Sequence, residues 1–262
     1  MRIATWNINS LRARTEILAQ LVRERAPDVI CLQETKVEDA LFPHALFDEL
    51  GYIHRVINGI RNYHGVALVS RLPFSGSGRR DWCDKVDGRH VHATVDGVEI
   101  HSVYVPAGGD IPDPALNVKF AHKLAFMGQK TAWWAARRDD GMPRILLGDL
   151  NVAPLETDVW SHKQLLNVVS HTPIEVEHLL AWQRAGGWID AVRQLVPAEE
   201  KLYSWWSYRA KDWRAADRGR RLDHAWVTAP LAPVVAGCEI MKDARDWTRP
   251  SDHVPVIVDL RL

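Results

Sequence analysis

The sequence predicts an α/β protein, built as a layered sandwich of mixed β-sheets with helices packed outside. Short apolar runs typical of buried strands alternate with amphipathic helical segments in part of the chain. Elsewhere strand follows strand, which requires antiparallel pairing. The 262 residues contain no internal repeat, low-complexity segment or long linker, so we expect one domain over residues 1–262. This mixture of element orders favours a sandwich over a barrel.

The N-terminal segment holds two predicted strands and a helix between them. The run "RIATWNI" opens the chain as a strand, and Asn7 and Asn9 share a parity and therefore one face. A helix follows, with Ser10 as its N-cap and its exit at Pro27. The run "DVICLQE" is then predicted as a buried strand that ends in Glu34.

The rest of the chain continues with strands and then with helices. From residue 52 to 105 the strands "GVALVS", "HVHATV" and "EIHSVYV" are separated by the turn signals "SGSG" and "VDG", which is a β-meander pattern. Residues 116–138 are helical by periodicity, and "RILLGDLN" is a buried strand that runs into a loop. Thr172, Pro173 and Glu175 form a capping box that opens another helix. The last strands are "LDHAWVT" and "VPVIVDL".

Composition excludes several classes of protein. With 47% hydrophobic and 25% charged residues the chain is neither disordered nor fibrous. No apolar stretch approaches the roughly 20 residues that cross a bilayer, and the N-terminus lacks the layout of a signal peptide, so we expect a cytoplasmic protein. Its 3 cysteines form neither a disulfide framework nor a CxxC metal site. Lys+Arg equals Asp+Glu at 33 each, so net charge does not support general polyanion binding.

Four carboxylates lie at the ends of predicted strands. Glu34 and Asp149 follow the strands "VICLQ" and "RILLG", whereas Asp223 and Asp252 precede "HAWVT" and "VPVIV". Between antiparallel neighbours the start of one strand and the end of the next share an edge, so all four are expected on one rim. Taken singly, each residue also has an ordinary interpretation as a turn residue or an ion-pair partner. Because all four share this placement, we expect them to form one functional site.

Gathered carboxylates repel one another and need a positive partner. Carboxylate and amide oxygens without clustered Cys or His suit Mg²⁺, or Mn²⁺, better than zinc. A hard divalent ion with open positions is the usual partner of phosphate oxygens. The rim is therefore predicted to bind a phosphate ester through a divalent cation.

These residues belong to a longer series of motifs, and the series resembles one family. The motifs are "TWNINSLRAR", "CLQETK", "VYVP", "GDLN", "YSWWSYR", "RGRRLDH" and "SDHVPV". In order and rough spacing they resemble the exonuclease III and apurinic/apyrimidinic (AP) endonuclease family, of the bacterial exodeoxyribonuclease III type. That family is a branch of the endonuclease, exonuclease and phosphatase superfamily. "GDLN" and "SDH" are shared across the superfamily, while "QETK", "NINSLRAR" and "YSWWSYR" narrow the match to the DNA repair branch.

The resemblance implies a four-layered α/β sandwich, with two mixed, mostly antiparallel sheets packed face to face and helices outside. It implies that Glu34 is the principal metal ligand, with Asn9 and Asp252 near the same ion. Asn7 would hold this network in place. Lys36 would lean toward the metal ligands or the phosphate.

The resemblance also implies roles in hydrolysis. Asp149 would orient or deprotonate the attacking water, and Asn151 would contact the phosphate. Tyr104 would donate to a phosphate oxygen or assist the leaving group. Asp223 and His253 would form a hydrogen-bonded pair that presents a proton to the phosphoryl oxygen as negative charge builds there.

On the DNA side, the resemblance places Trp205 near the pocket for an abasic or flipped-out sugar. Arg220 and Arg221 would bind the substrate and offset Asp217, which stands where relatives often have asparagine. Ala107 replaces an amide side chain that relatives often offer to the phosphate. Both departures bear on DNA binding and leave the hydrolytic positions intact.

The expected function is a divalent-metal-dependent DNA repair phosphodiesterase. It would act as a monomer on double-stranded DNA, cleaving 5′ to abasic sites and trimming blocked 3′ ends as a 3′–5′ exonuclease. The alternatives are a phosphoesterase for a small molecule or lipid head group and a catalytically silent DNA-binding protein. "QETK" and "YSWWSYR" argue against the first alternative, and retention of the hydrolytic positions argues against the second.

Overall fold

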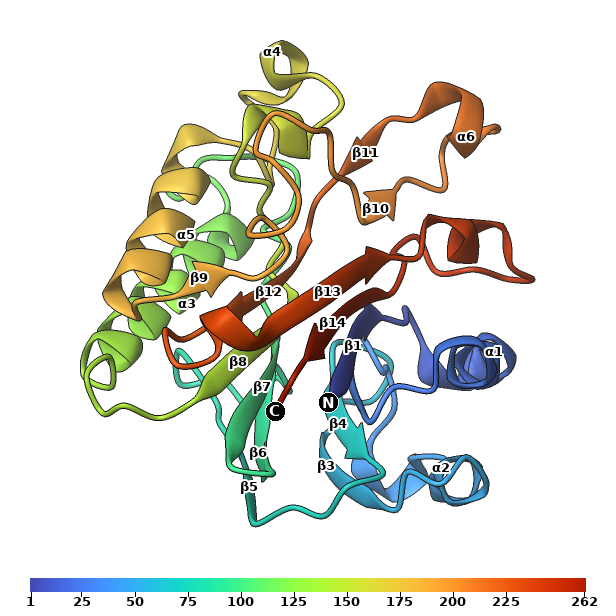
Figure 1. Cartoon of the computed structure of the whole chain (residues 1–262). Coiled ribbons are helices and arrows are strands. Elements are labelled where there is room, and N and C mark those ends of the chain that lie inside the picture. Colours follow the sequence, from blue (N-terminus) through green and yellow to red (C-terminus); the bar gives the residue numbers. More distant parts are fainter.

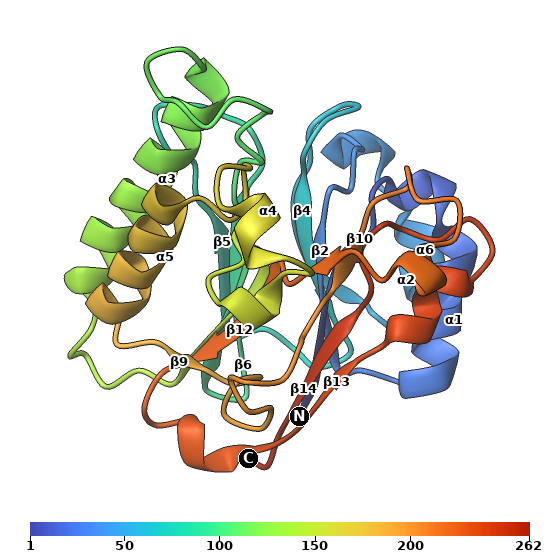
Figure 2. The ribbon, with the colours of Figure 1, turned by 90° about the horizontal axis from the view of Figure 1, so that it is seen from above.

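The computed structural model describes residues 1–262 and has two six-stranded sheets packed face to face. Helices cover the outer face of each sheet, which gives four layers (Figure 2). The predicted α/β sandwich is thereby confirmed. No helix in the structure has the length and apolar character needed to cross a membrane.

The first sheet lies beside helices α1 (Thr15–Arg25) and α2 (His44–Glu49), as Figure 1 shows. Its strands in spatial order are β13 (Val235–Ile240), β14 (Val256–Leu260), β1 (Arg2–Asn7), β2 (Val29–Gln33), β4 (Val66–Ser70) and β3 (His54–Asn58). Only β1 and β2 run parallel, and the other neighbours are antiparallel.

The second sheet is covered by helices α3 (Val118–Ala135) and α5 (Pro173–Ala185). Its strands in spatial order are β5 (Gly76–Arg79), β6 (His90–Val95), β7 (Val98–Tyr104), β8 (Arg144–Asp149), β12 (Asp223–Val227) and β9 (Ile189–Asp190). Here β7 and β8 are the parallel pair. Beyond the two sheets lie α4 (His162–Leu165) and the short antiparallel pair β10 (Trp205–Trp206) and β11 (Gly219–Arg220). The short helix α6 (Trp213–Ala216) lies on the side of the molecule that carries α1 (Figure 2).

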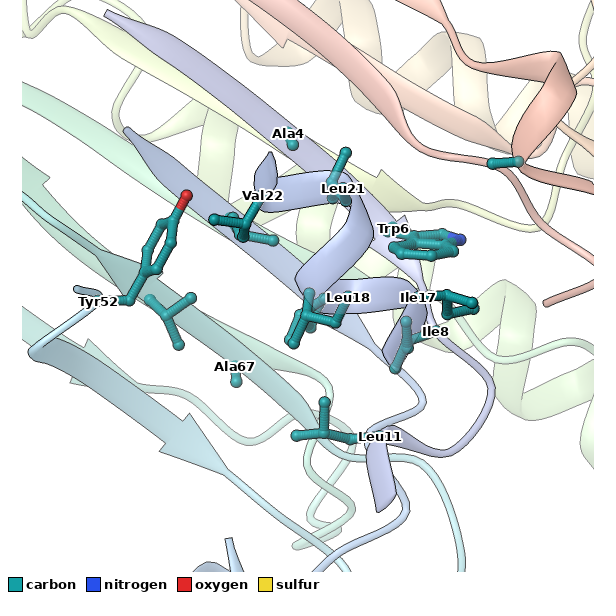
Figure 3. Packing of buried hydrophobic residues seen from close by; sticks show 14 of the residues in the cluster. Ala4, Trp6, Ile8, Leu11, Ile17, Leu18, Leu21, Val22, Tyr52 and Ala67 are labelled. Atoms are coloured by element: carbon teal, nitrogen blue, oxygen red, sulfur yellow. The ribbon is translucent and has the colours of Figure 1, made fainter. Parts of the chain in front are cut away.

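The core is divided among the layers by strand alternation, because successive side chains of a strand point to opposite faces. Ile3 of β1 joins a cluster of 22 buried residues between the two sheets. Its neighbours Ala4 and Trp6 join a cluster of 23 on the other face, against Leu18 and Leu21 of α1 (Figure 3). A third cluster of 16 buried residues packs α3 and α5 on the second sheet.

The structure corrects three details of the predicted elements. Ser10 makes no capping bond, and α1 begins at Thr15 after a short 3₁₀ turn over Leu11–Ala13. The predicted meander is divided, because β3 and β4 pair in the first sheet and β5 to β7 pair in the second. The turn signal "SGSG" overlaps the edge strand β5, whose sequence is "GSGR". The capping box at α5 is present as predicted.

Candidate active site

Strands of both sheets begin or end at one rim of the sandwich. Tyr104 ends β7 opposite Asp149, the last residue of β8, and Asp149 lies opposite Asp223, the first residue of antiparallel β12. In the first sheet Asn7 ends β1, and Glu34 directly follows the parallel neighbour β2. Strand register therefore brings these polar side chains to the same edge.

Asn7 joins the two sheets at this rim. Its buried Nδ2 donates to Glu34 Oε1 at 3.0 Å and to Asp149 Oδ2 at 2.9 Å. The Ser251 hydroxyl donates to the backbone carbonyl of Asn7 at 2.7 Å. The amide of Asn7 therefore sets the spacing between two carboxylates that belong to different sheets.

Glu34 receives hydrogen bonds on both oxygens. Besides the bond from Asn7, the Tyr104 hydroxyl donates to Oε1 at 2.7 Å and the Lys36 ammonium lies 2.8 Å from Oε2. Burial raises the pKa of Glu34, but the charge of Lys36 and these hydrogen bonds outweigh burial and lower the pKa to about 2. Glu34 is therefore an anion at neutral pH.

A second chain of contacts connects Glu34 to Asp252. Lys36 Nζ also donates to Asn9 Oδ1 at 2.7 Å, and Asn9 Nδ2 donates to Asp252 Oδ1 at 3.0 Å. Oxygens of Glu34 and Asn9 thus converge on one cationic group, the Lys36 ammonium. Carboxylate and amide oxygens directed at a positive charge are a donor set that fits a hard divalent cation.

Several residues of this rim adopt left-handed backbone conformations that non-glycine residues rarely have. The φ angles are 47° at Asn9, 50° at Glu34, 51° at Lys36 and 53° at Asn151. Such conformations cost free energy and cluster at functional sites. They also correct the predicted geometry, because β1 ends at Asn7 and Asn9 reaches the site through a turn, not along a shared strand face.

His253 lies between two carboxylates. Its Nδ1 is 2.8 Å from Asp223 Oδ2, and its Nε2 is 3.6 Å from Asp149 Oδ2. Burial lowers the pKa of His253, but the charges of Asp223 and Asp149 raise the pKa above its ordinary value. One potential metal-ligand atom from each of these three residues lies within 4.8 Å of the other two, so the cluster could hold a metal ion instead of a proton. We interpret the cluster as a protonated imidazole and not as a metal site, because the contact between His253 Nδ1 and Asp223 has the length of a hydrogen bond.

Asp149 is 1% exposed and occupies the centre of the network. Burial raises its pKa, while His253 and the hydrogen bond from Asn7 oppose that rise. The backbone N–H of Asn151 donates to Asp149 Oδ1 at 3.0 Å, and Asn151 Nδ2 donates to Val105 O at 2.9 Å. Asp149 thus has fixed donors on both oxygens.

The network opens into a cavity of about 680 Å³. Trp205 forms part of its wall and donates from Nε1 to Asp252 Oδ2 at 2.9 Å. The guanidinium of Arg220 lies over the Trp205 ring at 5.3 Å, and that of Arg218 lies over the Trp160 ring at 4.7 Å. The cavity is therefore lined by acidic residues and His253 together with arginine and tryptophan: Trp160, Trp205, Arg209, Arg218 and Arg220.

The structure corrects two predictions about residues expected near the DNA, Arg221 and Asp217. Arg221 is 1% exposed, and it donates to Asp158 Oδ1 at 2.8 Å and to Asp190 Oδ2 at 2.7 Å. It lies in a buried ion-pair cluster and does not line the cavity, so no substrate contact is assigned to it. The extra charge of Asp217 is offset by Lys242 at 3.0 Å, and not by the neighbouring arginines.

Three supporting residues were not identified from the sequence. Ser204 donates to Asp223 Oδ2 at 2.6 Å, and Trp6 donates from Nε1 to the carbonyl of His253 at 3.0 Å. Ser251 accepts from the backbone N–H of His253 at 3.2 Å. The only signal was adjacency, since Ser204 precedes "WW" and Ser251 precedes "DH".

A two-sheet sandwich whose rim joins anionic carboxylates, amides and an imidazolium defines a phosphoester hydrolase. The chain belongs to the Endonuclease/Exonuclease/phosphatase family, whose model matches residues 4–253. It is 29% identical over 271 residues to exodeoxyribonuclease III of Haemophilus influenzae, with 100% of both chains covered. Its structure is similar to that of an AP endonuclease from Archaeoglobus fulgidus, with a TM-score of 0.92, 30% identity and 100% of both chains covered.

A similar match is found with the 3′ phosphatase NExo from Neisseria, solved bound to a product DNA hairpin. The TM-score is 0.92 and the identity 29%, again over 100% of both chains. The family and these full-length relatives identify the chain as an enzyme, a phosphodiester hydrolase, and confirm the resemblance inferred from the motifs.

Proposed function

We propose that this chain is a DNA repair phosphodiesterase that incises double-stranded DNA 5′ to abasic sites and removes blocking groups from 3′ ends, acting as a monomer. One observation carries the proposal: Asn7 joins Glu34 to Asp149, and His253, paired with Asp223, lies 3.6 Å from Asp149, all at one cavity that Trp205 also lines. The full-length similarity to exodeoxyribonuclease III and to the two solved nucleases supports DNA as the substrate.

A divalent cation fits the oxygens of Glu34 and Asp252, with the Asn9 amide beside them. We assign Mg²⁺ to this place, with Mn²⁺ as a substitute, because the donors are hard and no thiolate is among them. When bound, the ion supplies Lewis-acid stabilisation of phosphate charge. Lys36 keeps Glu34 ionised, and Asn9 joins Lys36 to Asp252, which prepares the site for a cation.

Asp149 and His253 act on the phosphorus centre from the same wall. Asp149, held by Asn7 and Asn151, orients the attacking water and accepts its proton, and its raised pKa suits that task. His253 is held as an imidazolium by Asp223 and presents its Nε2–H to the phosphoryl oxygen that gains charge. Both groups are fixed before substrate arrives, so they need little reorganisation.

The remaining residues contact the substrate around this centre. The Tyr104 hydroxyl is bonded to Glu34 and, beside the scissile phosphate, donates to the phosphate or the leaving oxygen. Asn151 lines the cavity and contacts the phosphate there. Trp205 and Arg220 form the face against which an abasic sugar or a terminal nucleotide packs.

The proposal is tested with a duplex that carries one internal abasic analogue. The protein is incubated with this duplex in Mg²⁺, and a parallel sample receives EDTA. We expect incision 5′ to the analogue in Mg²⁺ only, and removal of a 3′ phosphate from a nicked duplex under the same conditions. Binding without cleavage in both Mg²⁺ and Mn²⁺ would overturn the proposal in favour of a silent DNA-binding protein.

A further inference from the structure

Lys123 and Glu175 form a completely buried ion pair behind the cavity wall. Both side chains are 0% exposed, with Lys123 on α3 and Glu175 in the first turn of α5. Taking two charges out of water is costly, and apolar residues of similar volume often replace buried pairs without loss of stability. Stability alone therefore does not account for the pair. Its contacts point to another role.

The ammonium of Lys123 holds two segments that line the cavity. It donates to the backbone carbonyl of Asn151 at 2.7 Å, to that of Ala107 at 3.3 Å and to Glu175. A lysine ammonium has three N–H donors, so all of them are used. Ala107 and Asn151 follow the strands that carry Tyr104 and Asp149 to the rim.

The carboxylate of Glu175 holds a third cavity segment. It accepts from the backbone N–H of Ser170 at 2.9 Å and from the Thr172 hydroxyl at 2.6 Å. The Ser170 hydroxyl in turn accepts from Arg220, the cation that lies over Trp205, at 2.7 Å. Each end of the ion pair thus reaches a different part of the cavity wall.

Both ends hold a residue in a left-handed conformation. The φ angle is 53° at Asn151 and 88° at Ser170, and neither residue is a glycine. A backbone of this kind persists only where its surroundings fix it. Lys123 fixes the first through its carbonyl, and Glu175 fixes the second through its N–H.

We propose that Lys123 and Glu175 are positioning residues for phosphodiester hydrolysis, holding the Ala107, Asn151 and Ser170 segments in the geometry that the chemical step requires. The inference rests on the proposed function, because it assumes that the scissile phosphate lies against Asn151. Neither residue touches the substrate. Their removal is expected to slow the chemical step while substrate binding is largely retained.

The test uses the full chain carrying Lys123→Met together with Glu175→Gln. This pair of changes removes both charges, so no unpaired buried charge remains, and the glutamine oxygen still accepts from Ser170. We expect kcat on the abasic duplex to fall on the order of 10- to 100-fold, since small misplacements of catalytic groups have effects of that size. KM is expected to stay within about twofold, and the melting temperature to fall by about 3 °C or less, equivalent to a small change in stability.

Arg144→Met is the matched control. Arg144 is also buried and ion-paired, but it begins β8, whereas Asp149 ends that strand. We expect this variant to melt at a lower temperature with kcat and KM unchanged. A double variant with wild-type kcat, or a control variant with an equal loss of kcat, would overturn the inference. If the double variant does not fold, Glu175→Gln alone is held to the same criterion. Failure of the wild-type protein to cleave DNA would instead count against the proposed function.

Discussion

Within the candidate site, the neighbours of Glu34, Asp149 and His253 shift the pKa of each of these groups. Glu34 is held ionised by Lys36, and His253 is held protonated by Asp223 and Asp149. Asp149 has the opposite tendency, because burial raises its pKa. Carboxylates in different environments can therefore take different roles, one as a cation ligand and the other as a base for water.

Asp149→Asn is expected to abolish turnover and leave DNA affinity near that of the wild type. Asparagine has the same shape but cannot accept the proton of water, so the loss in the single-turnover rate should be about 10²- to 10⁴-fold, the usual range for a general base. Binding measured by fluorescence anisotropy gives the affinity. A variant that retains the wild-type rate would remove Asp149 from the mechanism.

His253→Ala should cost about 3 to 4 kcal/mol of transition-state stabilisation, the usual size of an oxyanion-type contribution. The loss is expected in kcat/KM, measured on the abasic duplex. Ser204→Ala is a useful companion, because it removes one donor to Asp223 and leaves the imidazole in place. We expect its loss to be smaller. A change of less than tenfold for His253→Ala would contradict the role assigned to the imidazole.

Most site residues could be predicted from the sequence because they are polar residues at the ends of apolar strands. Asn7, Glu34, Asp149 and Asp223 have this placement, and strand register brings them together. The buried position of Arg221 could not be predicted, because its partners Asp158 and Asp190 are distant in the sequence. Its neighbour Arg220 lines the cavity, so the sequence position of Arg221 did not indicate that its side chain is buried elsewhere.

At the level of elements, the fully buried strands could be predicted from the sequence, whereas the partly exposed edge strands could not. β2 and β8 are buried along their whole length and were predicted. β13 is half-buried at the edge of its sheet, and β5 is a glycine-rich edge strand, so neither has a clear apolar pattern. The Lys123–Glu175 pair was missed for a related reason, since it joins two helices 52 positions apart.

Gly148 is the one residue of β8 that no side chain can replace. Its φ angle is 149°, and a Cβ built there would lie 1.9 Å from the carbonyl oxygen of Val103 on β7. We expect Gly148→Ala to lower the free energy of unfolding by more than about 3 kcal/mol, measured by urea titration. Gly128→Ala on α3 is the control, because a Cβ there meets nothing within 4 Å. It should be neutral or stabilise by up to about 1 kcal/mol. Equal effects of the two changes would contradict the argument.

A chain of buried histidines between the second sheet and α3 should make stability fall in acid. Lys130 lies 2.9 Å from His90 Nδ1, His90 Nε2 lies 2.9 Å from His101 Nδ1, and His101 Nε2 lies 2.7 Å from Glu99. Burial lowers the pKa of His101 to about 4, although Glu99 opposes this shift. Below pH 6.5 the folded state thus binds fewer protons than the unfolded state. The contribution of neutral His101 to the free energy of unfolding is therefore present above pH 6.5 and is lost as the pH falls toward 4.

The size of this effect should be about 2 kcal/mol between pH 7 and pH 5, from the shift at His101 alone. Urea unfolding of the wild type and of His101→Asn at both pH values measures it as a difference. Asparagine can accept from His90 and donate to Glu99, but it does not titrate. The variant should therefore lose less stability on acidification. An equal loss in both proteins would contradict the assignment.

For the whole molecule, the two-sheet architecture explains how a chain with no net charge can recognise a polyanion. Lys+Arg and Asp+Glu are equal at 33, so attraction to DNA has to come from the arrangement of charge. The cavity is lined by Arg209, Arg218 and Arg220 as well as by the carboxylates. The arginines attract phosphate, whereas the carboxylates repel it until a cation neutralises the rim.

DNA affinity should therefore depend on divalent cation even where no cleavage occurs. With Asp149→Asn to prevent turnover, we expect the Kd for the abasic duplex to be about 10- to 100-fold higher in EDTA than in Mg²⁺ at matched ionic strength, because one or two unneutralised carboxylates near the phosphate cost on the order of 1 to 3 kcal/mol. A second change, Glu34→Gln, removes one of those charges and should narrow the difference. Fluorescence anisotropy of a labelled duplex measures each Kd. Equal affinity in EDTA and Mg²⁺ would mean that the carboxylate rim does not face the phosphate, and the placement of the cation at Glu34 and Asp252 would have to be abandoned.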